Sequence, residues 1–380
     1  MPAAALFFPL VLLLASPAGQ APSAPKEGFD AISRRAREAR EAGRTPEAVG
    51  LYRNALELRA DWDEGWWYLG VLLYESGKCD EADPAFGRFL ELKPQAGPGW
   101  VIRGVCAYDR GDFPQAIEWI QKGVGLGLGG NAELQRVAAT RLALGLVKTG
   151  QFELAIQPLT LLSRLSPDAP DLVEATGLAL LRLPFLPSEV PPERRELVQK
   201  LGRAGSYHLA RRGDEAAKAY EELVAAYPGE PRVRYAYGVF LLGSGSDKGL
   251  AELGRAVELD PGDVMARLEI AFELLLRGDH AGAKEQAAKA VERAPSLFVA
   301  RNALGRALVE LGELDAGIRE LEEAVRLAPE SPETHFTLAR AYARAGRDED
   351  AARERAVFAD LEERRRPAPG GTPAADPTRP

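Results

Sequence analysis

Residues 65–94 read GWWYLGVLLYESGKCDEADPAFGRFLELKP, and the spacing of small and aromatic residues in this stretch decides the fold. Each of four residues has an identical residue 34 positions later: Trp66, Gly70, Gly77 and Ala82 correspond to Trp100, Gly104, Gly111 and Ala116. The same period separates members of two series near the C-terminus, Pro261, Pro295, Pro329 and Gly278, Gly312, Gly346. An internal repeat of this length is typical of proteins that stack one small unit many times.

Each repeat unit predicts a pair of helices. It contains two windows of about 13 residues with apolar residues at helical spacing, separated by a glycine such as Gly77 or Gly312. Glycine takes the left-handed conformation that ends a helix at little cost, and a closing proline such as Pro94 cannot continue the second helix. Gly70 and Gly305 fall inside first helices, where glycine costs about 0.8–1 kcal/mol relative to alanine. We therefore expect close helix contacts there, with no room for a Cβ atom.

The pattern resembles the tetratricopeptide repeat, whose signature is W-x2-L-G-x2-Y…A-x3-F…A-x4-P. The residues that carry this resemblance are Trp66, Leu69, Gly70, Ala82, Phe86 and Pro94, then Leu304, Gly305, Ala324 and Pro329, then Leu338, Tyr342, Gly346 and Ala351. Leu73 stands in place of the signature tyrosine, and Phe89 in place of the later alanine. One unit is too short to bury a core alone, whereas stacked units cover one another. The expected fold is all-α, a right-handed α-solenoid of about nine TPR-like helix hairpins.

The repeats divide the chain into segments. We expect an N-terminal array of about four repeats at 29–169, an irregular repeat at 170–229, a C-terminal array of four repeats at 230–365 and a disordered tail at 366–380. The irregular repeat carries four prolines within 183–192, so that stretch is extended or turning. It is either a kink that acts as a hinge between two stacks or a recognition loop.

The N-terminus resembles an export signal. Residues 6–15 are a short apolar run followed by small residues at the spacing of a cleavage site, so we predict a signal peptide at 1–21 and a short leader at 22–28. The expected location is exported, periplasmic or extracellular. No later segment is long and apolar enough to cross a membrane. Cys79 and Cys106 are too few for a disulfide framework, and whether they form a bond stays open.

Composition and motifs argue against catalysis and nucleic-acid binding. The net charge of −8 does not suit a general nucleic-acid binder, which needs a basic surface to displace counterions. The three histidines, His208, His280 and His335, lie in different units without a paired-ligand motif. We therefore predict no enzyme activity, no catalytic residue, no metal site and no cofactor.

The resemblance also implies where a partner would bind. In tetratricopeptide repeat proteins, certain positions of the first helix of each unit face a concave groove. Carried over to this sequence, the candidate groove residues are Trp67, Val71, Tyr74, Val101, Tyr108, Asn302, Arg306, Phe336, Arg340 and Arg344. We expect Trp66 and Trp100 to pack in the core and Trp67 to point away from the packing face.

Two chemically different patches result, an aromatic one near the N-terminus and an arginine-rich one near the C-terminus. Arginine binds carboxylates through two parallel hydrogen bonds, and the C-terminal patch loosely resembles the carboxylate clamp of some family members, although the Lys and Asn pattern of that clamp is absent. The expected function is a noncatalytic protein–protein interaction scaffold that holds an extended or helical partner segment. The alternatives are periplasmic glycan or cell-wall binding, and an accessory subunit of an envelope enzyme or secretion complex. The partner is unknown.

Overall fold

The computed structural model describes residues 28–365, so the predicted signal peptide and the C-terminal tail lie outside the described residues. The described part is all-α, which confirms the expected solenoid of helix hairpins: it forms nine antiparallel pairs and one additional helix. None of its helices combines the length and the apolar character needed to cross a membrane. The chain divides into two compact units with the boundary between Pro94 and Gln95 in the sequence, and each unit is described by itself.

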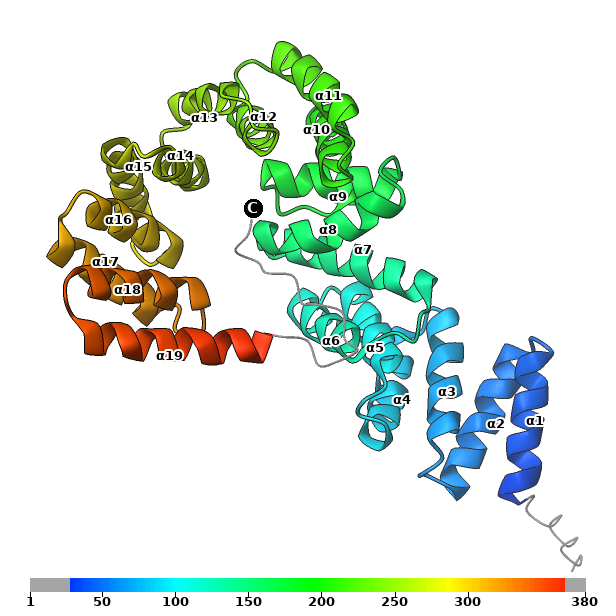
Figure 1. Ribbon diagram of the computed structural model, residues 1–380. Coiled ribbons are helices and arrows are strands. Elements are labelled where there is room, and N and C mark those ends of the chain that lie inside the picture. Colours follow the sequence, from blue (N-terminus) through cyan, green and yellow to red (C-terminus); the bar gives the residue numbers. More distant parts are fainter. Residues whose placement is uncertain (1–27, 366–380) are drawn as a thin grey trace, which may run out of the picture. The chain divides into compact units, whose positions relative to one another are not determined.

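Unit 1 contains two helix pairs (Figure 1). Their helices are α1 (Phe29–Glu41), α2 (Thr45–Leu58), α3 (Asp63–Glu75) and α4 (Cys79–Leu92). The core of this unit includes Tyr52 and Phe86, both fully buried. Cys79 of α4 is half-buried, whereas Cys106 of unit 2 is buried, and both are in the thiol form.

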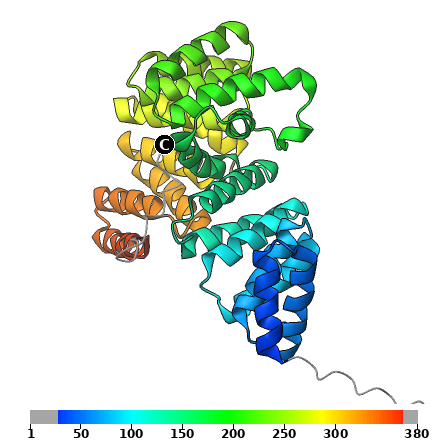
Figure 2. The ribbon, with the colours of Figure 1, turned by 90° about the vertical axis from the view of Figure 1, so that its right-hand side faces the viewer.

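Unit 2 contains the remaining helices, which follow one another as a stack of antiparallel pairs (Figures 1 and 2). They are α5 (Gly97–Asp109), α6 (Phe113–Leu126), α7 (Ala132–Lys148), α8 (Phe152–Leu165), α9 (Pro170–Leu181), a 3-10 turn (Pro187–Glu189), α10 (Pro192–Leu209), α11 (Gly213–Ala226), α12 (Pro231–Gly243), α13 (Lys248–Leu259), α14 (Val264–Arg277), α15 (His280–Arg293), α16 (Phe298–Glu310), α17 (Leu314–Leu327), α18 (Pro332–Arg344) and α19 (Asp348–Arg365). First helices of successive pairs also touch, as α14 does with α16 and α16 with α18.

The glycines inside helices are close-approach points, as the sequence predicts. A Cβ atom added at Gly70 would lie 2.8 Å from the ring of Phe86, and one at Gly305 would lie 2.6 Å from Leu321 and 2.9 Å from the backbone oxygen of Gly317. Such distances are well inside van der Waals contact. The absence of a side chain is what lets the two helices of a pair pack this closely.

The helix-ending turns follow the expected pattern with two exceptions, the left-handed arginines Arg182 after α9 (φ 54°) and Arg211 after α10. Gly77 (φ 72°) and Gly312 (φ 84°) take the left-handed conformation. In the irregular repeat, the sequence suggests that the turn glycine is Gly213, displaced from the usual spacing. The structure corrects this: Gly213 begins α11, and Arg211 is the left-handed residue, with φ 60°. The spacing from Arg211 to Pro228 equals the spacing from Gly312 to the proline that closes its own unit.

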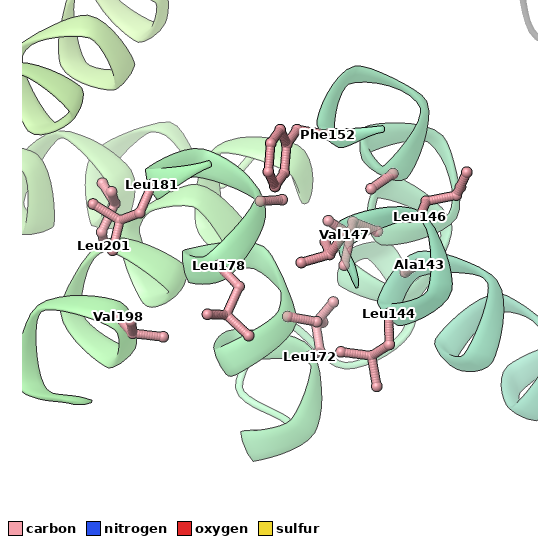
Figure 3. Packing of buried hydrophobic residues seen from close by; sticks show 14 of the residues in the cluster. Ala143, Leu144, Leu146, Val147, Phe152, Leu172, Leu178, Leu181, Val198 and Leu201 are labelled. Atoms are coloured by element: carbon pink, nitrogen blue, oxygen red, sulfur yellow. The ribbon is translucent and has the colours of Figure 1, made fainter. Parts of the chain in front are cut away.

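The proline-rich stretch between α9 and α10 is packed against the core. Val190 is 4% exposed and belongs to an apolar cluster that extends from α5 to α12, part of which is drawn in Figure 3. Glu189 forms an ion pair with Lys148 (2.7 Å) and accepts a hydrogen bond from the backbone N–H of Leu186. These contacts hold the stretch against the stack, which does not suit a projecting recognition loop.

The additional helix, α9, packs so closely against α10 that their backbones nearly touch at two glycines. A Cβ atom added at Gly177 would lie 2.0 Å from the backbone oxygen of Val198, and one at Gly202 would lie 1.8 Å from that of Val173. The residues of this interface in Figure 3 include Leu178, Val198 and Leu201. Helix α10 also pairs with α11, so it joins α9 to the second half of the stack.

A polar bridge recurs in the C-terminal repeats. The fourth residue of each first helix hydrogen-bonds a carbonyl oxygen six residues earlier and a side chain on the second helix of its pair. Arg301, for example, donates from Nε to the Pro295 oxygen (2.7 Å) and from a terminal nitrogen to Glu320 (2.7 Å). The corresponding residues of the other pairs are Arg234 with Pro228 and Glu252, Arg267 with Pro261 and Gln286, and His335 with Pro329 and Glu354.

Trp66 occupies the same helix position in unit 1, and its indole N–H donates to the Ala60 oxygen, again six residues earlier (2.8 Å). In the C-terminal repeats, the arginine or histidine that forms the bridge therefore replaces the tryptophan of the family signature. The bridge links the two helices of a pair to the loop that precedes them.

Candidate functional site

A pocket in unit 2 is the candidate functional site. It encloses about 210 Å³ and is built from α14 to α18. Its polar lining residues are His280, Arg306, Glu310, Thr337, Arg340 and Arg344. Apolar side chains, among them Leu275 and Val309, line the rest of its wall. We call it the arginine pocket.

The repeat brings these side chains together. Arg306 and Arg340 are separated by one repeat period and occupy the same position of neighbouring first helices, α16 and α18. Glu310 and Arg344 lie one helical turn further along the same two helices. Residues four apart share a helix face, so two contacting helices present four charged groups to one space.

The charges of the arginine pocket do not balance. Arg344 forms an ion pair with Glu310 (2.7 Å), and this hydrogen bond holds the pKa of the Glu310 carboxyl below its ordinary value. Arg306 and Arg340 form no ion pair with any residue between 28 and 365. Burial, and then the positive charge of Arg340, lower the pKa of the Arg306 guanidinium. Arg340 is exposed, and its guanidinium lies 5.9 Å from the centre of the Phe336 ring. Its positive charge also helps to hold the pKa of the Glu310 carboxyl down.

Two further polar groups near these arginines lack partners within the described part of the chain. The Nδ1 atom of His280 is buried without a hydrogen bond. Asn302, one helical turn before Arg306, is 9% exposed, and its Oδ1 atom is likewise unsatisfied. Buried polar atoms usually have a partner, so the surroundings of Arg306 offer more hydrogen-bonding capacity than the protein itself uses.

The structure therefore brings three of the predicted C-terminal groove residues, Arg306, Arg340 and Arg344, into one pocket. Asn302 does not line the pocket and is largely buried in α16. Phe336 is 45% exposed but does not line the pocket, and its ring packs against Phe358 of α19 with centroids 5.4 Å apart.

The predicted N-terminal patch is split between the two units. Trp67, Val71 and Tyr74 belong to α3 of unit 1, and all three are half-buried. The ring of Trp67 lies 5.9 Å from Phe86 and 5.1 Å from Phe89 of the paired helix. The expectation that Trp67 points away from the packing face is therefore wrong, because its ring reaches across to α4.

In unit 2 the structure contradicts two predicted groove residues. Val101 is fully buried, because α5 and α6 meet at Gly123, where an added Cβ atom would lie 2.7 Å from the Val101 side chain. Tyr108 is 8% exposed and packs against Phe113, with ring centroids 5.3 Å apart, and burial raises the pKa of its phenol. Neither side chain offers a surface to a partner.

The two tryptophans predicted as core residues, Trp66 and Trp100, are only half-buried. The ammonium of Lys122 lies 3.6 Å from the centre of the Trp100 ring. The tryptophan that is buried is Trp62, at 8% exposure, which stacks on Tyr52. The prediction of core positions for Trp66 and Trp100 is thus wrong.

Sequence reasoning missed Glu310 and His280 as pocket residues. Glu310 could have been found, because it lies one repeat period before Arg344 at an equivalent helix position of opposite charge. His280 begins α15, a second helix, and the assumption that only first helices form the groove excludes it. Among residues 28–365 no cluster of side chains suits a metal ion.

Comparison with known proteins identifies the repeat. The family model described as "Tetratricopeptide repeat" matches residues 33–82, 69–130, 203–263 and 302–360. No curated protein matches the sequence.

Among solved structures, similar chains include three of MamA. One is MamA from Desulfovibrio magneticus RS-1, starting at its residue 41, with 25% identity over 40% of this chain and 89% of that one and a TM-score of 0.38. A second is MamA MSR-1, with 25% identity, 44% and 97% coverage and a TM-score of 0.39. A third structure of MamA has 18% identity, 42% and 95% coverage and a TM-score of 0.40. Scores of this size carry no argument about function.

The matches to the family model cover more than half of the chain, and they include both pairs of unit 1 and the arginine-bearing helices α16 and α18. The glycine contacts and helix pairs described above are those that the family signature requires. The chain belongs to the tetratricopeptide repeat family.

Proposed function

We propose that this chain is a noncatalytic scaffold that binds a segment of a partner protein on unit 2, with the arginine pocket as the anchoring point. Membership of the tetratricopeptide repeat family supports a protein–protein interaction scaffold in general. The observation that carries the specific proposal is the pair Arg306 and Arg340, two guanidinium groups in one pocket without a carboxylate of their own.

The anchoring group of the partner is negatively charged. Each guanidinium presents several N–H donors in a fixed plane and binds an anionic oxygen pair through two hydrogen bonds. A partner segment that crosses α16 and α18 would place such a group between Arg306 and Arg340. The apolar wall at Leu275 and Val309 would contact the carbon atoms that carry the charge.

Selection from a displayed random peptide library on the immobilised full chain tests this function. Selected peptides are expected to be enriched in Asp and Glu, and the double variant Arg306→Met/Arg340→Met is expected to lose at least tenfold in affinity for them. Methionine keeps most of the side-chain volume without the charge. Arg319→Gln is the matched control, because Arg319 is exposed on α17 outside the pocket. Equal binding by the double variant and the control would remove the pocket from the proposal.

The aromatic alternative, glycan or cell-wall binding, has less support. It depends on free tryptophan faces, whereas Trp62 stacks on Tyr52, Trp67 packs on α4 and Trp100 is covered by Lys122. Sedimentation of the full chain with purified cell-wall material discriminates the two functions. An accessory subunit of an envelope enzyme or secretion complex would use the same surface with a different partner.

Export through the predicted signal peptide, residues 1–21, is part of the same proposal. It is supported by the short apolar run and the small residues that follow it. Sequencing the N-terminus of the mature protein from fractionated cells tests it. Cleavage at or before residue 22 in an exported fraction is expected, and an intact N-terminus in the cytoplasmic fraction would exclude it.

A further inference from the structure

The arginine pocket contains more positive charge than one carboxylate can neutralise. Three guanidinium groups, those of Arg306, Arg340 and Arg344, line it together with a single carboxylate, Glu310. Glu310 is bound to Arg344 at 2.7 Å. Glu310 also interacts electrostatically with Arg306 and Arg340, but one carboxylate cannot neutralise three guanidinium groups. Two positive charges therefore remain in excess, on neighbouring helices that touch.

This arrangement costs folding free energy. A cation that loses contact with water without gaining a partner is destabilised, and like charges placed near each other add to the cost. Arg306 experiences both effects, from burial and from Arg340. Local arrangements that oppose stability concentrate at functional sites, where a ligand supplies what the protein lacks.

We propose that the arginine pocket binds a phosphate monoester, a doubly charged group carried by a phosphorylated serine or threonine of the partner segment. This inference rests on the proposed scaffold function and names the group that the pocket recognises. Phosphorylated side chains carry about −1.5 to −2 charges at pH 7, which matches the two unpaired cations. A single carboxylate leaves one of them uncompensated.

Geometry favours the same group. A phosphate offers three oxygen atoms with several lone pairs each, so Arg306 and Arg340 can both bind it in a forked manner while sharing one oxygen. His280 lines the pocket with a ring nitrogen that makes no hydrogen bond to the described residues, and it adds a further polar group. One water molecule needs about 10–15 Å³ of such a cavity, so 210 Å³ accommodates a phosphate and the first carbon atoms behind it.

Glu310 limits the charge of the pocket. Its carboxylate forms an ion pair with Arg344, which keeps that guanidinium from binding a ligand, and its negative charge repels an incoming anion. Replacing it by glutamine would free Arg344 and remove the repulsion. The proposal therefore predicts that Glu310→Gln binds phosphate monoesters several-fold more tightly than the natural chain does, a gain that damage to the fold does not produce.

Titration calorimetry on the full chain tests the inference with four probes. They are inorganic phosphate and three peptide pools that share random flanking residues around a central phosphoserine, serine or glutamate. The phosphoserine pool is expected to bind at least tenfold more tightly than the glutamate pool. Arg306→Met and Arg340→Met are each expected to lose at least tenfold of this affinity, while Arg319→Gln keeps it. Thermal unfolding of each variant checks that the pocket is folded.

The outcomes separate the two proposals. If glutamate and phosphoserine pools bind equally and both depend on Arg306 and Arg340, the phosphate inference is overturned and the scaffold function stands. If inorganic phosphate binds as tightly as the phosphoserine pool, the pocket serves a free phosphate compound, and the scaffold function falls. If no probe depends on Arg306 or Arg340, both are overturned.

Discussion

The recurring bridge of the C-terminal repeats predicts a specific pattern of stability loss, and Arg301→Met is its clearest perturbation. Arg301 (19% exposed) joins the Pro295 oxygen to Glu320 (26% exposed), and each hydrogen bond is 2.7 Å long. The substitution removes both bonds and leaves a largely shielded carboxylate without its cation. The stem of methionine preserves the packing of the side chain, so the polar loss dominates.

The magnitude follows from the kind of hydrogen bond that the substitution removes. A hydrogen bond to a charged group contributes about 1.5–3 kcal/mol net, and the partial exposure of both partners places the total at about 2–3 kcal/mol. The double variant Arg301→Met/Glu320→Met leaves no unpaired carboxylate, so its loss is expected to be at least about 1 kcal/mol below the sum of the two single losses. Lys284→Met is the control. Its ion pair with Glu313 is of similar length (2.8 Å) but exposed, at 39% and 45%, and is worth about 0.5 kcal/mol.

Urea unfolding at constant pH gives the free energy of unfolding for each variant. Because neighbouring repeats couple and unfolding departs from two states in long arrays, amide hydrogen exchange in α16 and α17 gives the local value. The claim that the bridge stabilises the pair would be refuted if Arg301→Met cost less than about 0.5 kcal/mol, the value of an exposed ion pair. Equal losses for Arg301→Met and Lys284→Met would refute it as well.

Three further predictions concern single positions. Arg211→Gly is expected to raise the melting temperature. The left-handed conformation costs arginine about 1–2 kcal/mol, and the larger backbone entropy that glycine loses on folding offsets only about half of the gain. An unchanged or lower melting temperature would contradict this prediction. Gly305→Ala is expected to cost about 1–3 kcal/mol, because its Cβ atom would lie 2.6 Å from Leu321 and 2.9 Å from the Gly317 oxygen. Urea unfolding that shows no loss would mean that the helices can move apart. Arg306→Met is expected to leave the free energy of unfolding unchanged or higher while reducing ligand affinity, so a clear destabilisation in thermal unfolding would show that Arg306 is structural.

The fold was predictable because its determinants are local and periodic. Gly70 and Gly305 are needed where helices touch, and Gly77 and Gly312 are needed where the chain turns. The spacing of glycines in the sequence therefore reflects the packing of the helices directly. Arg211 shows the limit of this reasoning. The turn at Arg211 has the usual left-handed conformation but contains no glycine there. The nearest glycine, Gly213, lies two residues later, so a prediction from glycine positions puts the turn two residues too far along the chain.

The candidate site was only partly predictable. Helix position placed Arg306 and Arg340 together, and both line the same pocket, because residues at equivalent positions of touching helices face the same space. That they bind a partner stays a prediction. Helix position failed for Val101 and Trp67, because it determines only where the Cα–Cβ bond of a residue points. It does not determine what covers the side chain or which neighbour a long side chain reaches. Val101 is covered by the close approach of α6, and the long ring of Trp67 reaches the paired helix. The pairing of Arg344 with Glu310, which decides the charge of the pocket, depends on side-chain conformation.

Site-specific photocrosslinking in the cells that make this protein tests the central claim most directly. A photoreactive residue at Thr337, inside the arginine pocket, is expected to capture a protein segment that carries a phosphorylated or acidic residue at the crosslink. The capture should disappear when Arg306→Met and Arg340→Met are added, and the same photoreactive residue at Ala352, exposed on α19, should not produce it. Identical capture from both positions, or capture at Thr337 that persists without the two arginines, would contradict the account.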